Sequence, residues 1–157
     1  MRKSTLFIFS ILISVNVEAH VVSSCDGVYS ARIGAGGGLV IQQAGRYLGV
    51  VKTDHDVDGG LFSPDDSILI AFGLPTEIDA RSPKITRVSI YSVKPTVSLI
   101  HRVSYGGGVY DVAFSDDQNY VFVNNQYGVD VIDIRRGNFQ PYDSTHVPQF
   151  TTQQCRK

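Results

Sequence analysis

Cysteine is scarce in this sequence, positive charge is nowhere concentrated, and the apolar spacing of a helix is missing. No stretch keeps apolar residues at 3.6-residue intervals over three turns, so we expect almost no helix. The 14 basic and 15 acidic residues form no basic stripe, which argues against nucleic acid or an anionic membrane surface as a partner. The four histidines are scattered, and none has a second side chain at metal-ligand spacing.

The residue patterns of common catalytic sites are missing as well. The sequence has no G-x-S-x-G elbow. The glycines of Ile33–Gly38 lack the G-x-G-x-x-G spacing of a phosphate-binding loop and lie between two expected strands, so they predict a turn. His101, Asp111 and a serine could form a triad, but any β domain of this size offers such a set. We therefore expect a protein without enzymatic activity and without a cofactor.

The first residues indicate export. Arg2 and Lys3 precede an apolar run, Leu6–Val15, and small residues follow at the positions before a cleavage site. The run is shorter than the about 20 apolar residues of a membrane-spanning helix. We expect residues 1–19 to be a secretory signal that is removed before His20, which leaves a periplasmic protein with no membrane-inserted segment.

The two cysteines, Cys25 and Cys155, lie near opposite ends of the exported chain. In an oxidising compartment we expect them to form one disulfide. A second interpretation is open for Cys25, because Val22–Cys25 resembles a bacterial lipoprotein box and would place a fatty acid on that thiol. Residues 20–157 suffice for a single domain, and their net charge is −2 once the two basic residues and one acidic residue of the signal are subtracted.

The body of the chain contains a repeated pattern. Leu61–Phe72 aligns with Ala113–Asn124: each is a strand ending in Phe-Ser, an aspartate-rich turn and a strongly apolar strand. The second halves of the units repeat too, and a third, N-terminal copy starts near Tyr29. These copies predict three units at residues 27–56, 60–104 and 108–142. The first unit has no opening strand of its own in this alignment, and we expect residues 147–153 to supply it.

These residues resemble the WD40-like and YVTN-type repeats of β-propellers, with Val109–Asp117 and Val131–Gly137 as the closest match. The resemblance covers most of residues 27–142 and implies an all-β fold built from blades. Complete rings take four to eight blades, whereas this chain has three units. We therefore predict an incomplete, about three-bladed β-propeller-like arc whose termini are tied by the disulfide.

An acidic stretch before the second unit poses an alternative. Asp54, Asp56 and Asp58, with a glycine sixth and Asp65 twelfth, have the ligand spacing of a calcium loop. The repeat accounts for Asp65, which we align with Asp116, and extended residues before it oppose the coiling that a calcium loop needs. We predict a solvated acidic loop and no metal; a weak calcium site at the first three aspartates is the alternative.

The strongest candidate for recognition is a glycine-rich loop between the second and third units. Three glycines let its backbone approach another surface closely, and its tyrosines offer anchors with polar tips. The alternative is a plain inter-blade turn with one tyrosine packed inside. The insertion Leu74–Lys84 is a second candidate element. The predicted partner-binding residues are Ser104, Tyr105, Gly106, Gly107, Gly108 and Tyr110.

In size, export signal and fold style the chain resembles the periplasmic immunity proteins that neutralise type VI-secreted cell-wall amidases. In that family a loop of a β-propeller-like domain plugs the active-site cleft of the toxin. The resemblance implies a non-enzymatic inhibitor whose partner is an exported or injected effector enzyme. It transfers no inhibitory residue, because no family motif aligns. The alternative function is a calcium- or glycan-binding module of the cell envelope.

Overall fold

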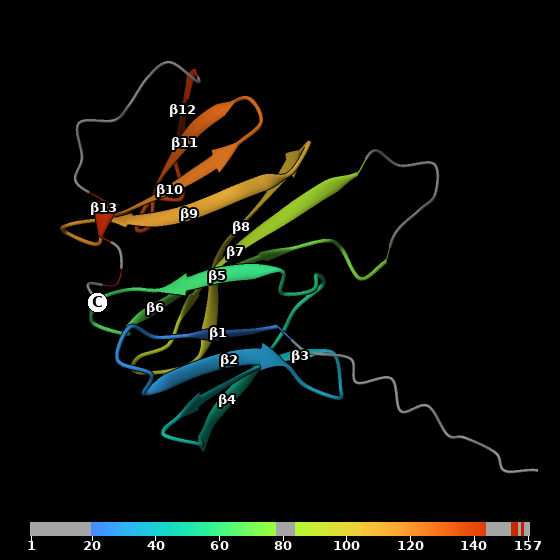
Figure 1. Cartoon of the computed structure of the whole chain (residues 1–157), viewed down its shortest axis with the longest axis vertical. Coiled ribbons are helices and arrows are strands. Elements are labelled where there is room, and N and C mark those ends of the chain that lie inside the picture. Colours follow the sequence, from blue (N-terminus) through green and yellow to red (C-terminus); the bar gives the residue numbers. More distant parts are fainter. Residues whose placement is uncertain (1–19, 78–83, 144–151, 154, 156–157) are drawn as a thin grey trace, which may run out of the picture.

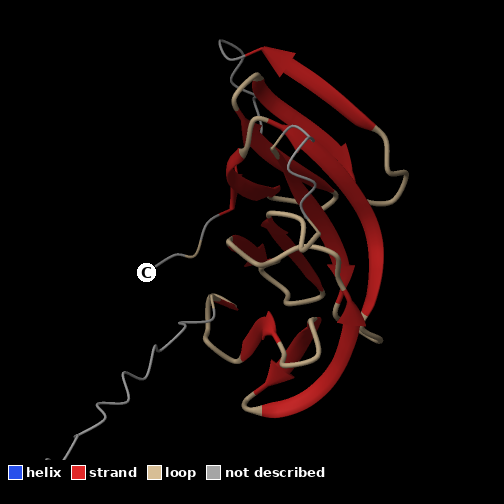
Figure 2. Ribbon diagram, turned by 90° about the vertical axis from the view of Figure 1, so that its right-hand side faces the viewer, coloured by secondary structure: helices blue, strands red, loops and turns tan. Residues whose placement is uncertain are grey.

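The computed structural model describes residues 20–77, 84–143, 152, 153 and 155, and they form three antiparallel sheets (Figure 1). The expected secretory signal, residues 1–19, and the centre of the insertion at 78–83 lie outside the described residues. Every described element is a strand or a loop (Figure 2). Among these residues there is accordingly no helix long and apolar enough to span a membrane.

Each sheet is one unit of four consecutive strands, and the third sheet carries one strand more. The first sheet contains β1 (Val21–Ser23), β2 (Tyr29–Ile33), β3 (Gly38–Gln43) and β4 (Arg46–Lys52). The second contains β5 (Gly59–Phe62), β6 (Ile68–Gly73), β7 (Ile85–Ser92) and β8 (Ser98–Gly106). The third contains β9 (Val109–Ser115), β10 (Tyr120–Asn125), β11 (Gly128–Asp133), β12 (Phe139–Asp143) and β13 (Thr152–Gln153).

The second sheet lies between the other two and is buried on both faces. In β6, Leu69 and Ala71 belong to the core shared with the first sheet, whereas Ile70 between them belongs to the core shared with the third. Since successive side chains of a strand point to opposite faces, a central strand must be apolar at every position. The unbroken run Ile68–Phe72 meets this requirement.

The first strands of the three units, β1, β5 and β9, lie side by side on the near face in Figure 1. This is the arrangement of the inner strands of a propeller, here limited to three blades. The predicted all-β, incomplete propeller-like fold is therefore confirmed. The predicted disulfide is confirmed too: Cys25 and Cys155 are bonded, with their Cα atoms 5.1 Å apart.

The prediction for the C-terminal strand is wrong. The first unit has its own opening strand, because β1 pairs with β2 along Val21–Ser23. The sequence pattern missed this strand because it is only three residues long. The C-terminal strand β13 pairs instead with the inner edge of β9, where Thr152 lies opposite Ser115. The disulfide thus joins the first sheet to the third.

One polar turn recurs between the first two strands of every unit. In each, a serine hydroxyl donates to an aspartate two residues later at 2.6 Å and accepts from the backbone N–H five residues later. The serine and aspartate pairs are Ser24 with Asp26, Ser63 with Asp65, and Ser115 with Asp117. The structural counterpart of Asp65 is therefore Asp117, as the alignment of Leu61–Phe72 with Ala113–Asn124 requires, and the pairing of Asp65 with Asp116 is wrong.

Candidate functional site

The predicted binding loop is a tight turn that joins β8 to β9. Gly107 and Gly108 have φ angles of +102° and +98°, a backbone region that favours glycine. A side chain added at Gly106 or Gly108 would meet no atom within 4 Å, so the turn projects into open space. Only Gly107 is enclosed, because an added Cβ there would collide with the side-chain amide of Gln126.

The two tyrosines of the predicted loop have opposite environments. Tyr105 is only 7% exposed and packs in the core between the second and third sheets, whereas Tyr110 is 65% exposed. The prediction that both rings flank the turn at its rim is therefore wrong for Tyr105. Its position in β8, paired with Thr86 of β7, turns the side chain inward. Ser104 and Gly106 belong to the same strand.

The buried hydroxyl of Tyr105 lies near the carboxylate of Asp130 but makes no hydrogen bond of good geometry. Burial raises the pKa of Tyr105 well above its ordinary value, and the negative charge of Asp130 raises it further. Burial also raises the pKa of Asp130, and the Tyr105 hydroxyl partly offsets that rise. The buried Tyr105 ring anchors the strand that leads into the turn, and it is not available to a partner.

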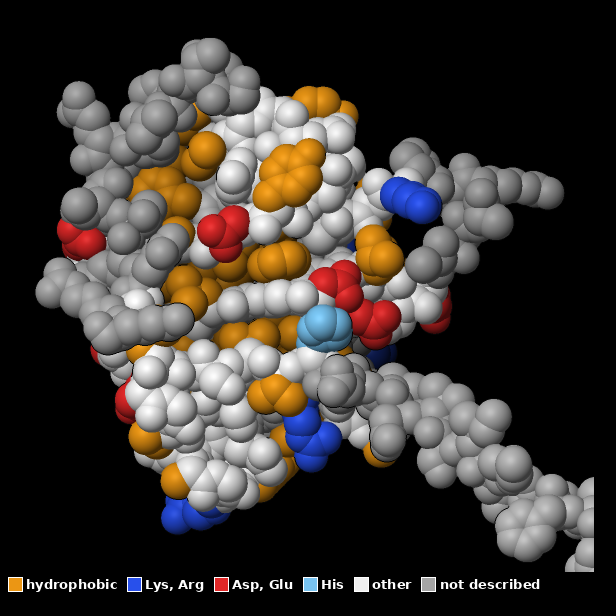
Figure 3. Space-filling model, viewed as in Figure 1, with side chains coloured by type: hydrophobic (Ala, Val, Ile, Leu, Met, Phe, Trp, Pro, Cys, Tyr) orange, Lys and Arg blue, Asp and Glu red, His pale blue; other side chains and the backbone are white. Residues whose placement is uncertain are grey.

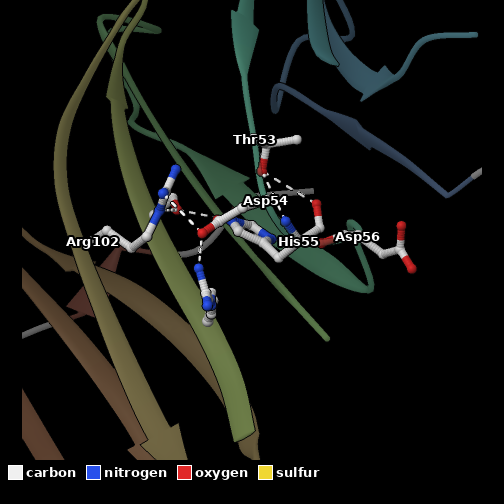
Figure 4. Close-up of polar contacts among 7 residues, drawn as sticks. Thr53, Asp54, His55, Asp56 and Arg102 are labelled. Carbon is white, nitrogen blue, oxygen red and sulfur yellow. Dashed lines mark hydrogen bonds and ion pairs between the residues drawn. The ribbon is translucent and has the colours of Figure 1, made fainter. Parts of the chain in front are cut away.

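The three aspartates of the acidic stretch do not converge on one point. Asp54 forms ion pairs with Arg87 and Arg102, the second at 3.1 Å, and Asp58 accepts a hydrogen bond from the backbone N–H of Leu74. The Asp56 side chain is exposed and points away from Asp54 (Figure 4). The described residues contain no group of three or more acidic, histidine or cysteine side chains placed to hold a metal ion.

A buried polar network that sequence reasoning missed lies behind this stretch (Figure 4). His55 and Ser89 are both fully buried, and His55 Nε2 lies 2.8 Å from Ser89 Oγ. His55 Nδ1 donates to the Asp56 carbonyl at 2.7 Å, so Nε2 must accept the proton of Ser89. Arg102 Nε donates to the same serine oxygen. No sequence signal joins residues 34 positions apart, and their complete burial keeps the pair from any substrate.

The electrostatics of His55 follow from its position. Burial lowers its pKa below the ordinary 6.5, and the positive charge of Arg102 lowers it further, although the Asp56 carbonyl acts in the opposite direction. The imidazole is therefore held neutral. Its role is to link the connection between the first and second sheets to β7.

Two shallow depressions on the described surface lie away from the glycine turn. The larger, about 520 Å³, is on the outer face of the first sheet beside Gly36–Gly38, where Val40 and Val50 line it. The smaller, about 230 Å³, is polar and lies at one end of the third sheet, beside Arg135 and Arg136. Figure 3 shows the face of the inner strands, where apolar side chains are exposed between the sheets.

Comparison with known proteins shows the fold alone. No family model and no curated protein matches the sequence. Among solved structures, a eukaryotic initiation factor matches with a TM-score of 0.57 and 11% identity over 82% of this chain and 34% of its own. A putative 6-phosphogluconolactonase from Bacteroides fragilis matches with a TM-score of 0.53 and 16% identity over 85% and 38% of the two chains.

A third structure, the dihydro-heme d1 dehydrogenase NirN, matches with a TM-score of 0.51 and 16% identity over 77% of this chain and 26% of its own. The chain thus spans about a third of the length of the structures it matches. At such identities the likeness supports the propeller-like fold and gives no activity.

Proposed function

We propose that this chain is a periplasmic immunity protein that inhibits a secreted peptidoglycan amidase by inserting the β8–β9 turn into its active site. The observation that carries the proposal is the turn itself, in which a side chain added at Gly106 or Gly108 would meet no atom within 4 Å. A backbone turn without side chains enters a cleft that is too narrow for a bulkier loop. It also presents peptide N–H and C=O groups to the polar groups of a catalytic centre.

The fold supports this use of the turn. β8 and β9 are strands of nine and seven residues that belong to two packed sheets. Tyr105 anchors β8 in the core just before the turn. A loop held between rigid elements loses little conformational entropy when it binds. The expected export signal would bring the protein to the compartment in which an injected cell-wall amidase acts.

The decisive experiment measures inhibition of secreted peptidoglycan amidases, beginning with any that is encoded beside this gene, with purified cell-wall sacculi as substrate. We expect stoichiometric inhibition by the wild-type protein and a loss of about a hundredfold or more for Gly106→Trp, which places a bulky side chain at the base of the turn, on the last residue of β8. The matched control is Gly36→Trp, because Gly36 lies in the β2–β3 turn and its Cβ position is equally open. Both variants should keep the wild-type melting temperature.

Gly106 is a better test than Gly107. A side chain at Gly107 would be strained by its positive φ angle and would collide with Gln126, so loss of binding there would also report a damaged fold. Absence of inhibition by the wild-type protein would overturn the proposed function. Equal inhibition by wild type and Gly106→Trp would show that the turn does not enter the cleft.

A further inference from the structure

Among the described residues each sheet contains one β-bulge, and the bulge of the third sheet differs from the other two. In the first two sheets the extra residue is Leu48 of β4 or Ile100 of β8, on the outer strand. Both side chains pack against the hydrophobic cores. In the third sheet the extra residue is Tyr110 of β9, on the inner strand. Its ring is 65% exposed, so this bulge adds little to the core.

Bulges re-aim side chains and are frequent beside binding sites. The bulge at Tyr110 follows directly on the glycine turn, since Val109 is the only residue between them. Because the other two units have no counterpart on their inner strands, the propeller repeat does not account for it. The bulge is therefore a local feature that turns one aromatic ring outward next to the turn.

The β10–β11 hairpin presents a second exposed ring at the same place. Tyr127, at the tip of this hairpin, is 72% exposed. The hairpin is braced on both sides: the buried Asn125 accepts a hydrogen bond from the Tyr127 N–H at 2.8 Å, and Gln126 Nε2 donates to the Gly106 carbonyl at 3.3 Å. Asn125 also pairs with Val109, so both tyrosines lie within two residues of one strand pair.

We propose that Tyr110 and Tyr127 flank the glycine turn as the two aromatic anchors of one contact surface, and that a folded protein buries them at the rim of the cleft that the turn enters. This inference rests on the proposed function. It replaces Tyr105 by Tyr127 in the predicted set and adds a second element, the β10–β11 hairpin.

The shape of this surface favours a protein over a glycan. Glycans and other small ligands occupy concave sites, whereas the turn projects outward and the two depressions described above lie elsewhere. Tyrosine is enriched at the centres of protein interfaces because it buries a large ring while its hydroxyl keeps a hydrogen bond. Two rings on braced elements suit such an interface.

The test measures, by titration calorimetry, the affinity of the amidase that the wild-type protein inhibits for Tyr110→Ser, Tyr127→Ser and the double variant. We expect each single change to weaken binding by about tenfold or more, and the double change to weaken it further. The matched control is Tyr47→Ser, because Tyr47 is 58% exposed but lies on β4 of the first sheet. It should alter affinity by less than about twofold.

The outcomes separate this inference from the proposed function. If the amidase binds and Gly106→Trp abolishes binding while both tyrosine variants bind as wild type, the anchors are wrong and the inserted turn stands. If the wild-type protein does not bind the amidase at all, both proposals fall. Tyrosine-dependent binding to sacculi alone would identify a glycan site and overturn the inference.

Discussion

His55 shows how a single buried side chain holds two blades together. Its ring accepts the Ser89 hydroxyl proton on Nε2 and donates to the Asp56 carbonyl from Nδ1, and the bond from Ser89 needs the neutral form because a protonated Nε2 cannot accept. Protonation would place a charge beside Arg102 in a site that is closed to water. The network is therefore a polar contact between the connection after β4 and the central sheet, and its strength depends on pH.

We predict that the free energy of unfolding falls as pH is lowered from 7 to 5. The folded-state pKa of His55 lies below the unfolded value of 6.5, so the unfolded chain takes up a proton first and the stability present above pH 6.5 is lost as pH falls toward the folded pKa. His55→Gln should flatten this dependence in urea titrations. The exposed His20→Gln is the control, and an unchanged slope in His55→Gln would contradict the prediction.

At the scale of residues the sequence predicted the chemistry better than the orientation. The glycine turn could be predicted because three consecutive glycines stand out in the sequence. Glycine readily adopts the positive φ angles that the turn contains. Which tyrosine faces the core was not visible, because it depends on the pairing of β8 with β7 and on a bulge in β9. Register and bulges are set by contacts between strands, which a single sequence does not record.

At the scale of elements, the serine–aspartate turn is the unit that the chain repeats. The serine bonds tie together both ends of the turn, and the Ser115 and Asn119 bonds lower the pKa of Asp117 to about 2, so its carboxylate stays charged. The sequence showed two copies because Phe-Ser precedes both. The third, Ser24 with Asp26, was missed because β1 lacks the phenylalanine and Cys25 stands inside the turn.

We predict that Ser63→Ala and Ser115→Ala each lower the free energy of unfolding by about 1–2 kcal/mol, because a buried hydroxyl with two partners is lost. Urea denaturation of the oxidised protein measures the effect. Ser98→Ala, at an exposed position of β8, should change stability by less than about 0.5 kcal/mol. Equal effects at all three serines would show that the turn bonds are not what stabilises the units.

At the scale of the whole molecule, the fold was predictable because three repeats and two cysteines constrain it strongly. The place of β13 was not, since any open inner edge accepts a short strand equally well. The edge that it occupies belongs to the third sheet, and the disulfide carries the chain end back to the first. The bond therefore ties together the two outer sheets of the arc.

We predict that the oxidised protein has no free thiol and that Cys25→Ser or Cys155→Ser lowers the free energy of unfolding by several kcal/mol. The bond spans 130 residues, for which the loss of chain entropy in the unfolded state gives a stabilisation of about 5 kcal/mol. Thiol titration and urea denaturation measure the two quantities. Mass spectrometry that finds a fatty acid on Cys25 and a free Cys155 would contradict the bond.

The same bond closes residues 25–155 into a covalent circle, since it joins two cysteines that are 130 residues apart. A single proteolytic nick at a surface loop inside that circle creates new termini but releases no fragment. The product is a pair of chains that the disulfide holds together, so the three sheets are still covalently linked. A nicked molecule therefore falls apart only after a second cut or after reduction.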